Sequence, residues 1–123
     1  MIEGTFLVNG KIARILFDSG ASHSFVARSF MIDIELRAEL LPVPLEIALP
    51  VGRSVLLYSV YRSVVVRFDD YSFVADLVVL SMTGYDIILG MDWLSYYRVC
   101  LDCFAKTVSF PLRGIATIII ATA

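Results

Sequence analysis

Apolar segments rich in β-branched and aromatic residues alternate with turn signals along almost the whole chain. The strongest turn signal is Asn9-Gly10, which lies between the apolar runs 5–8 and 11–17. An Asn-Gly pair between two such runs strongly favours a tight β-hairpin, because both residues tolerate the positive φ angles of the turn. The first 17 residues are therefore predicted to form a hairpin.

The same alternation continues to residue 110. Further strand segments flanked by turn residues are 45–49, 54–60, 61–68, 71–80, 86–89, 99–102 and 107–110. The pairs 45–49 with 54–60 and 61–68 with 71–80 are each separated by only a few turn-forming residues, so we expect two more hairpins. The last two segments are expected to close the sheet. Short strands at this spacing predict an all-β, mainly antiparallel domain.

Three segments interrupt the strand pattern. Residues 24–30 are expected to form a helical turn. Residues 91–97 follow Gly90 and are predicted to form one short C-terminal helix, with Asp92 near its start, where an acid is favourable. Residues 33–44 are acidic and contain two prolines, which indicates a loop.

Length and composition restrict the class of protein. The chain has 123 residues, which suits one domain, and its 59% hydrophobic and 18% charged residues exclude a disordered chain. The formal net charge is -2 and no cluster of Lys or Arg is present, so no direct nucleic-acid ligand is expected. So much apolar surface on a small domain is consistent with burial between subunits.

Localisation is predicted from what the sequence does not contain. No basic and apolar leader opens the chain, and the apolar tail 115–123 is far shorter than the ~20 residues of a membrane-spanning helix, so no membrane association is expected. Cys100 and Cys103 are too few for a disulfide framework, and no second Cys/His pair completes a zinc site. We expect an intracellular, cytoplasmic protein with no metal and no cofactor.

One acidic loop carries the candidate chemistry. In Ile15-Leu16-Phe17-Asp18-Ser19-Gly20-Ala21-Ser22, an apolar strand leads into an acid, a hydroxyl residue and a glycine. The strand holds the carboxylate in position, the glycine permits a tight turn, and the hydroxyl offers a supporting hydrogen bond. Taken alone, the same tripeptide also occurs in ordinary turns in which the Asp side chain caps its own backbone.

A second segment changes the interpretation of the first. Asp86-Ile87-Ile88-Leu89-Gly90-Met91-Asp92-Trp93-Leu94 is an apolar strand that ends in glycine and leads into the predicted helix, and its Gly90 follows Gly20 by 70 residues. The two segments together resemble the retropepsin family, the aspartic proteases of retroviruses and long-terminal-repeat retrotransposons. Phe17 to Phe25, Ala75 to Leu80 and Asp86 to Leu94 look most like the protease domain of plant gypsy-class retrotransposon polyproteins.

The resemblance covers about residues 3–112, so residues 1–112 are taken as the protease domain and 113–123 as a tail without a family counterpart. It implies the closed β-barrel of retropepsins, with each subunit holding half of a dimeric active site. A module of the same kind in ubiquitin-linked shuttle proteins is a more distant likeness.

The resemblance also implies a function. The chain would be an aspartic endopeptidase subunit, with Asp18 as its one catalytic residue, acting as a homodimer on peptides or a retroelement polyprotein. No second Asp-Thr/Ser-Gly is present, so one chain cannot supply both carboxylates. The implied supporting residues are Ser19, Gly20 and Ala21 in the loop, Ile88, Leu89 and Gly90 in the strand beneath it, and Pro50, Val51 and Gly52 in a flap. The alternative for the flap is an ordinary surface hairpin.

Other interpretations remain open at this level. His23 next to Ser22 and Ser24 allows a Ser/His/Asp site, although no nucleophile elbow is present. Asp86 and Asp92 are interpreted as a strand-edge residue and a helix N-terminal acid. The main functional alternative is a degenerate or repurposed retropepsin-fold module that dimerises or binds without cleaving. A generic β-barrel interaction domain, in which Asp18 has no role, is the third.

Overall fold

The computed structural model describes residues 2–49, 51–111 and 115–119. The elements are β1 (Ile2–Val8), β2 (Lys11–Phe17), β3 (Phe25–Ala27), the 3₁₀ helix η1 (Arg28–Met31), β4 (Glu39–Ala48), β5 (Ser54–Phe68), β6 (Tyr71–Leu80), β7 (Ile87–Leu89), α1 (Met91–Tyr96), β8 (Cys100–Asp102), β9 (Thr107–Phe110) and β10 (Ile115–Ile119). The prediction of an all-β chain with one short helix after Gly90 is confirmed. No helix in the described ranges is long and apolar enough to cross a membrane.

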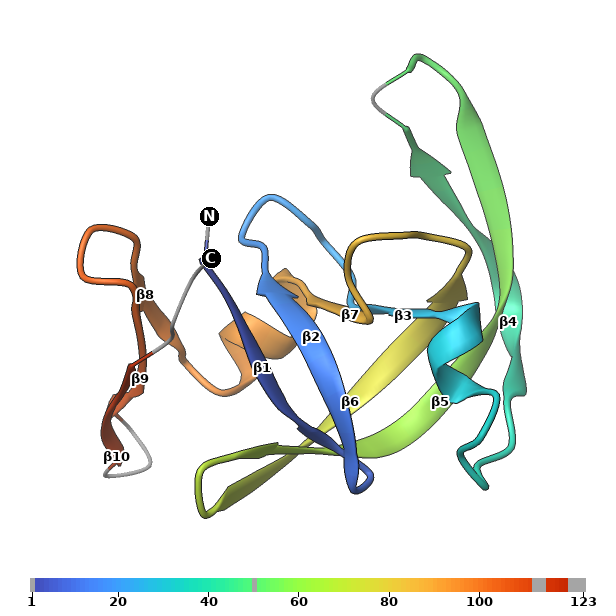
Figure 1. Ribbon diagram of the computed structural model, residues 1–123. Coiled ribbons are helices and arrows are strands. Elements are labelled where there is room, and N and C mark those ends of the chain that lie inside the picture. Colours follow the sequence, from blue (N-terminus) through green and yellow to red (C-terminus); the bar gives the residue numbers. More distant parts are fainter. Residues whose placement is uncertain (1, 50, 112–114, 120–123) are drawn as a thin grey trace.

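Seven strands form the main sheet in the order β1-β2-β7-β3-β6-β5-β4 (Figure 1). The end of β1 also pairs with β5, through Leu7 with Arg67 and Val8 with Val66, so six of the strands close into a ring. Most pairings are antiparallel, but β2 with β7 and β3 with β6 are parallel. The fold is therefore a small, mainly antiparallel barrel.

The three predicted hairpins form where the turn residues indicate them. Asn9 and Gly10 have φ angles of 50° and 81°, as the β1–β2 turn requires. Asp69 has a φ of 53° in the β5–β6 turn. The β4–β5 hairpin rises above the barrel on one side, away from the rest of the chain (Figure 1).

Three local predictions are wrong. The expected loop 33–44 becomes strand from Glu39 onward, because β4 pairs with β5 and its Pro42 and Pro44 lie where the pairing register shifts, between Leu40 and Leu45. An edge strand tolerates prolines there, because their missing N–H groups face no partner strand. The expected helical turn at 24–30 begins as strand β3 and only then continues as η1, because β3 is inserted between β6 and β7.

The third correction concerns the C-terminal strands. β8 and β9 do not complete the main sheet but form a separate three-stranded sheet with β10, in the order β10-β9-β8. β10 lies within the tail 113–123, and the remaining tail residues 113–114 and 120–123 are outside the described ranges. The hydrophobic pattern of a short strand does not say which sheet it joins.

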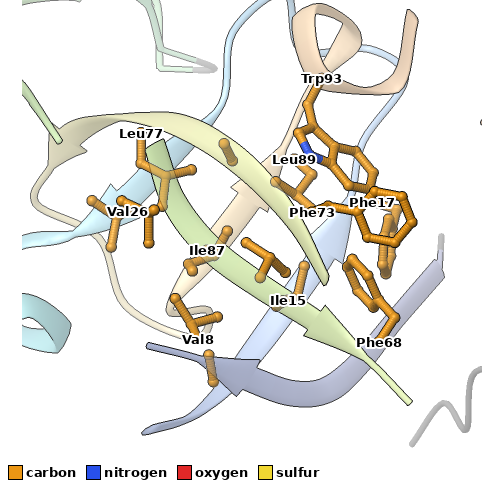
Figure 2. Packing of buried hydrophobic residues seen from close by; sticks show 14 of the residues in the cluster. Val8, Ile15, Phe17, Val26, Phe68, Phe73, Leu77, Ile87, Leu89 and Trp93 are labelled. Atoms are coloured by element: carbon orange, nitrogen blue, oxygen red, sulfur yellow. The ribbon is translucent and has the colours of Figure 1, made fainter. Parts of the chain in front are cut away.

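The core fills the ring of strands. Aromatic side chains gather at one end of it, where Phe73 stacks on Phe110 at 4.5 Å between ring centroids and Trp93 lies edge-on to Phe73. Figure 2 shows Phe17, Phe68, Phe73 and Trp93 together at this end, and the aliphatic residues Val8, Val26, Leu77 and Ile87 further along. Phe110 thus ties the C-terminal sheet to the barrel.

Candidate active site

Asp18 is the first residue after β2 and is only partly buried. Its position is set by the parallel pairing of β2 with β7, in which Phe17 lies opposite Leu89. The Asp18 amide extends this ladder by donating to the carbonyl of Leu89 at 2.9 Å. The strand of Ile88, Leu89 and Gly90 therefore lies directly beside the start of the acidic loop.

The loop turns tightly around the Asp18 carboxylate. The Gly20 amide donates to Oδ1 of Asp18 at 2.9 Å, and the Ala21 amide donates to the Asp18 carbonyl at 3.2 Å. A Cβ on Gly20 would lie 3.2 Å from that same Oδ1. The Asp18 side chain therefore caps its own backbone within one chain. The Ser19 side chain is exposed.

Gly90 packs against the far side of the same loop. A Cβ at this position would overlap the carbonyl oxygen of His23 and would lie 2.7 Å from that of Ala21, so only glycine fits. The next amides bind the loop directly, with Met91 donating to Ala21 at 2.7 Å and Asp92 donating to Ser22 at 3.3 Å. The start of α1 and the acidic loop thus form one rigid unit.

A buried bridge that the sequence did not reveal completes this unit. Ser24 is 1% exposed, and its hydroxyl accepts from the Gly90 amide at 3.0 Å and donates to Oδ1 of Asp92 at 2.7 Å. The same Oδ1 accepts from the Trp93 amide at 2.7 Å. Asp92 does lie in the first turn of α1, but its carboxylate also orients Ser24. The only sequence signal for this bridge was a polar residue immediately before the apolar run 25–27.

The Ser/His/Asp alternative finds no support in the contacts. The hydroxyl of Ser22 and Nδ1 of His23 are hydrogen-bonded at 2.8 Å, but they are sequence neighbours on the same loop. No carboxylate hydrogen-bonds to His23 within the described ranges, and the Asp92 side chain is engaged by Ser24 instead. Asp86 lies just before β7, where its carboxylate accepts from the Arg14 amide at 2.7 Å.

The flap residues lie at the tip of the β4–β5 hairpin. Val51 and Gly52 are exposed in the turn, Gly52 has a φ of 84°, and its amide donates to Leu49 at 3.1 Å, while Pro50 is outside the described residues. Below the tip, a second apolar cluster joins this hairpin to the barrel, and Leu57, Phe25 and Val78 are buried in it. Ile88 packs against this cluster from β7, so the apolar surface between hairpin and barrel reaches the strand beside Asp18.

The described residues offer no group of three His, Cys, Asp or Glu side chains that could hold a metal ion. Cys100 and Cys103 are both exposed free thiols. The chemistry available at this site is that of a partly exposed carboxylate held at the end of a strand, with the Gly20 amide bound to one of its oxygens.

Comparison with known proteins supplies the family. The family model described as retroviral aspartyl protease matches residues 1–113, and no curated protein matches the chain. Among solved structures, the retroviral protease-like domain of Ddi1 from Leishmania major is similar with a TM-score of 0.75 and 16% sequence identity, over 99% of this chain and 94% of that one. This likeness shows the retropepsin-like fold. On the family match over nearly its whole length, the chain belongs to the retroviral aspartyl protease family.

Proposed function

We propose that the chain is an aspartic endopeptidase subunit in which Asp18 supplies one of two catalytic carboxylates. The observation that carries this proposal is the placement of Asp18 at the end of β2, with its amide bound to Leu89 and Gly90 closing the loop from behind. This arrangement holds a carboxylate rigidly while leaving Ser19 and one side of the loop exposed. The protease domain would be residues 1–112, with 113–123 as a tail.

A second copy is needed for the chemistry. The sequence contains a single Asp-Ser-Gly, so the other carboxylate has to come from another subunit. Two carboxylates about 3 Å apart cannot both ionise, and such a pair shares one proton. In the homodimer the ionised oxygen would take a proton from a water molecule held between the two Asp18 side chains. The protonated oxygen would donate to the carbonyl of the scissile peptide as the water attacks it.

The neighbouring loop residues would hold the two Asp18 carboxylates in position. Gly20 already donates to Oδ1 of Asp18 and would keep that oxygen in place during proton transfer. The exposed Ser19 hydroxyl would hydrogen-bond across the dimer, and Ala21 would contribute backbone contacts. The strand of Ile88, Leu89 and Gly90 would act as the support that keeps both loops aligned.

The substrate would be an extended peptide lying between the β4–β5 hairpin and the acidic loops. The apolar cluster that includes Phe25, Leu57 and Ile88 would receive apolar side chains of this peptide. The hairpin tip at Pro50, Val51 and Gly52 would close over it and exclude water. By analogy with the family, the natural substrate would be a retroelement polyprotein.

Replacement of the carboxylate tests the proposal. We expect wild-type protein to cleave casein at mildly acidic pH, and Asp18→Asn to lose this activity while remaining dimeric in sedimentation equilibrium. Asp70→Asn, at an exposed turn, is the matched control and should cleave like wild type. A peptide mimic with a hydroxyl in place of the scissile carbonyl should bind the dimer, because that hydroxyl occupies the place of the attacking water.

The main alternative is a copy that keeps the fold and pairs without cleaving. It would dimerise, but wild-type and Asp18→Asn proteins would be equally inactive and the hydroxyl mimic would not bind. A strictly monomeric protein would contradict the endopeptidase proposal.

A further inference from the structure

An apolar cavity opens beside the acidic loop, on the side opposite the β4–β5 hairpin. Its volume is about 630 Å³, and its lining includes Ser19, Met91, Leu94, Val99, Leu101 and Cys103. It therefore extends from the residue after Asp18, along α1 and β8, to the start of the β8–β9 turn. Nothing in the described part of the chain fills it.

The proposed function places this cavity at a subunit boundary. A two-fold axis that brings two Asp18 side chains together must pass beside Asp18, and Ser19 is the next residue. The cavity rim at Ser19 therefore faces the second copy. The C-terminal sheet projects from the barrel on the side away from the β4–β5 hairpin (Figure 1), so it is also available to that copy.

The β8–β9 turn carries an apolar side chain that the described part of the chain leaves exposed. Phe104 is 98% exposed, more than any other large apolar residue in the described ranges. In the turn that carries it, the Ala105 amide donates to Oδ1 of Asp102 at 2.9 Å and Lys106 takes a positive φ of 57°. One exposed Phe is ordinary on a protein surface, but here it follows Cys103, which lines the empty cavity.

We propose that each subunit inserts Phe104 into the cavity beside Ser19 of its partner, so that two identical contacts lock the dimer below the catalytic pair. This inference rests on the proposed function for the position of the two-fold axis. A self-complementary contact of this kind is what two-fold symmetry requires, since the same turn and the same cavity occur on both copies. Aromatic anchors in apolar pockets commonly dominate the affinity of an interface.

The cavity and the Phe104 turn carry opposite charges beside them. Arg98 lines the cavity, is exposed, and makes no ion pair within the described ranges. Asp102, at the base of the Phe104 turn, is also exposed, and its side chain accepts from the Ala105 amide but makes no ion pair within the described ranges. A partner turn entering the cavity would bring its Asp102 towards this Arg98. The pairing would align the turn but add little affinity at an exposed rim.

The dissociation constant of the dimer tests this contact without relying on cleavage. Sedimentation equilibrium of the full chain over a dilution series should show that Phe104→Ser raises the dissociation constant by about tenfold or more. Ile32→Ser, at an exposed apolar residue after η1, is the matched control and should leave the constant within about twofold. Ser95→Phe, which places a bulky group at the cavity lining, should also weaken the dimer. The double variant Ser95→Phe/Phe104→Ser should have a dissociation constant close to that of Phe104→Ser alone, because both changes remove the same contact.

A second measurement reports on the position of the side chain. In Phe104→Trp, the emission of the introduced indole should shift to shorter wavelength as the protein concentration rises and dimers form, whereas the resident Trp93 is already buried. If Phe104→Ser dimerises as tightly as wild type, or the introduced indole stays exposed in the dimer, the inference is wrong even where casein is cleaved. If Phe104→Ser weakens a dimer that does not cleave casein, the inference holds and the endopeptidase proposal fails. A wild-type chain that is monomeric at every concentration overturns both.

Discussion

The backbone amide of Gly90 donates a 3.0 Å hydrogen bond to the buried hydroxyl of Ser24. This bond joins the strand beneath the site to the end of the acidic loop, and the same hydroxyl continues to Asp92 at the start of α1. The loop that carries Asp18 is therefore held from the side opposite its open face. These hydrogen bonds hold the loop without involving the Asp18 carboxylate.

Removing the Ser24 hydroxyl should loosen this unit. Ser24→Ala leaves the Gly90 amide and the Asp92 carboxylate without their buried partner, and an unsatisfied buried group costs about 1–3 kcal/mol. Urea unfolding monitored by Trp93 fluorescence measures the change. Ser29→Ala, at an exposed serine in η1, is the control and should stay within about 0.5 kcal/mol. Equal midpoints for the two variants would contradict the bridging role of Ser24.

The two glycines of the site should respond differently to a methyl group. Gly90→Ala places a Cβ against main-chain carbonyl oxygens of His23 and Ala21, which cannot move without shifting the loop, so we expect a loss of stability of about 3 kcal/mol or more. Gly20→Ala meets only one side-chain oxygen of Asp18, at 3.2 Å, and no main-chain atom, so a small rotation of that side chain relieves the contact. It should unfold at nearly the wild-type urea concentration but lose casein cleavage. If Gly90→Ala were as stable as Gly20→Ala, the close packing of Gly90 on the loop would be refuted.

The C-terminal sheet should depend on a single aromatic anchor. Phe110 is fully buried and stacks on Phe73, so Phe110→Ala is expected to cost about 3–5 kcal/mol through the cavity it leaves. Phe104→Ala, at the exposed end of the same hairpin, is the matched control. Measured at dilutions where the chain is monomeric, it should change the free energy of unfolding by less than about 0.5 kcal/mol.

Stability should depend on pH through Glu3. Hydrogen bonds from Tyr85 and then from Arg14 hold the pKa of the Glu3 carboxyl below its ordinary value of 4.5. A lowered pKa in the folded state means that this stabilisation is present above pH 4.5 and is lost as the pH falls through the lowered value. The difference in unfolding free energy between wild type and Glu3→Gln should therefore be larger at pH 7 than at pH 3.

Thermal unfolding at the two pH values measures this difference, and Tyr85→Phe serves as the comparison. It removes the bond that lowers the pKa of Glu3 most, so it should reduce the pH dependence while leaving the carboxyl in place. A difference between wild type and Glu3→Gln that is the same at both pH values would show that the hydrogen bonds on Glu3 do not act in the folded protein.

Local signals predicted much of the fold. The Asn9-Gly10 turn forms as expected because its conformation depends on two adjacent residues and not on distant packing. The helix after Gly90 also lies within the predicted range. The errors at residues 33–44 and 24–30 have another cause, since β4 and β3 are strands only because β5, β6 and β7 provide hydrogen-bonding partners.

In the candidate site, too, the local segments could be predicted and the contacts between them could not. The acidic loop and the glycine-ended strand could be recognised as segments, because each has a characteristic run of residue types. Their contact could not be derived from those runs. The Ser24–Asp92 bridge was missed, since a lone serine before an apolar run gives no indication of which polar group it meets 68 residues later.

By itself, the sequence determined the three hairpins, the short helix after Gly90 and which carboxylate is placed at a strand end, because these follow from side-chain type over a few neighbouring residues. Only the tertiary structure decided that Gly90 packs against the loop of Asp18, that Ser24 joins the two, and that a cavity lies beside Ser19. These relationships depend on the pairing of distant strands. That pairing is set by burial summed over the whole core and not by any single segment.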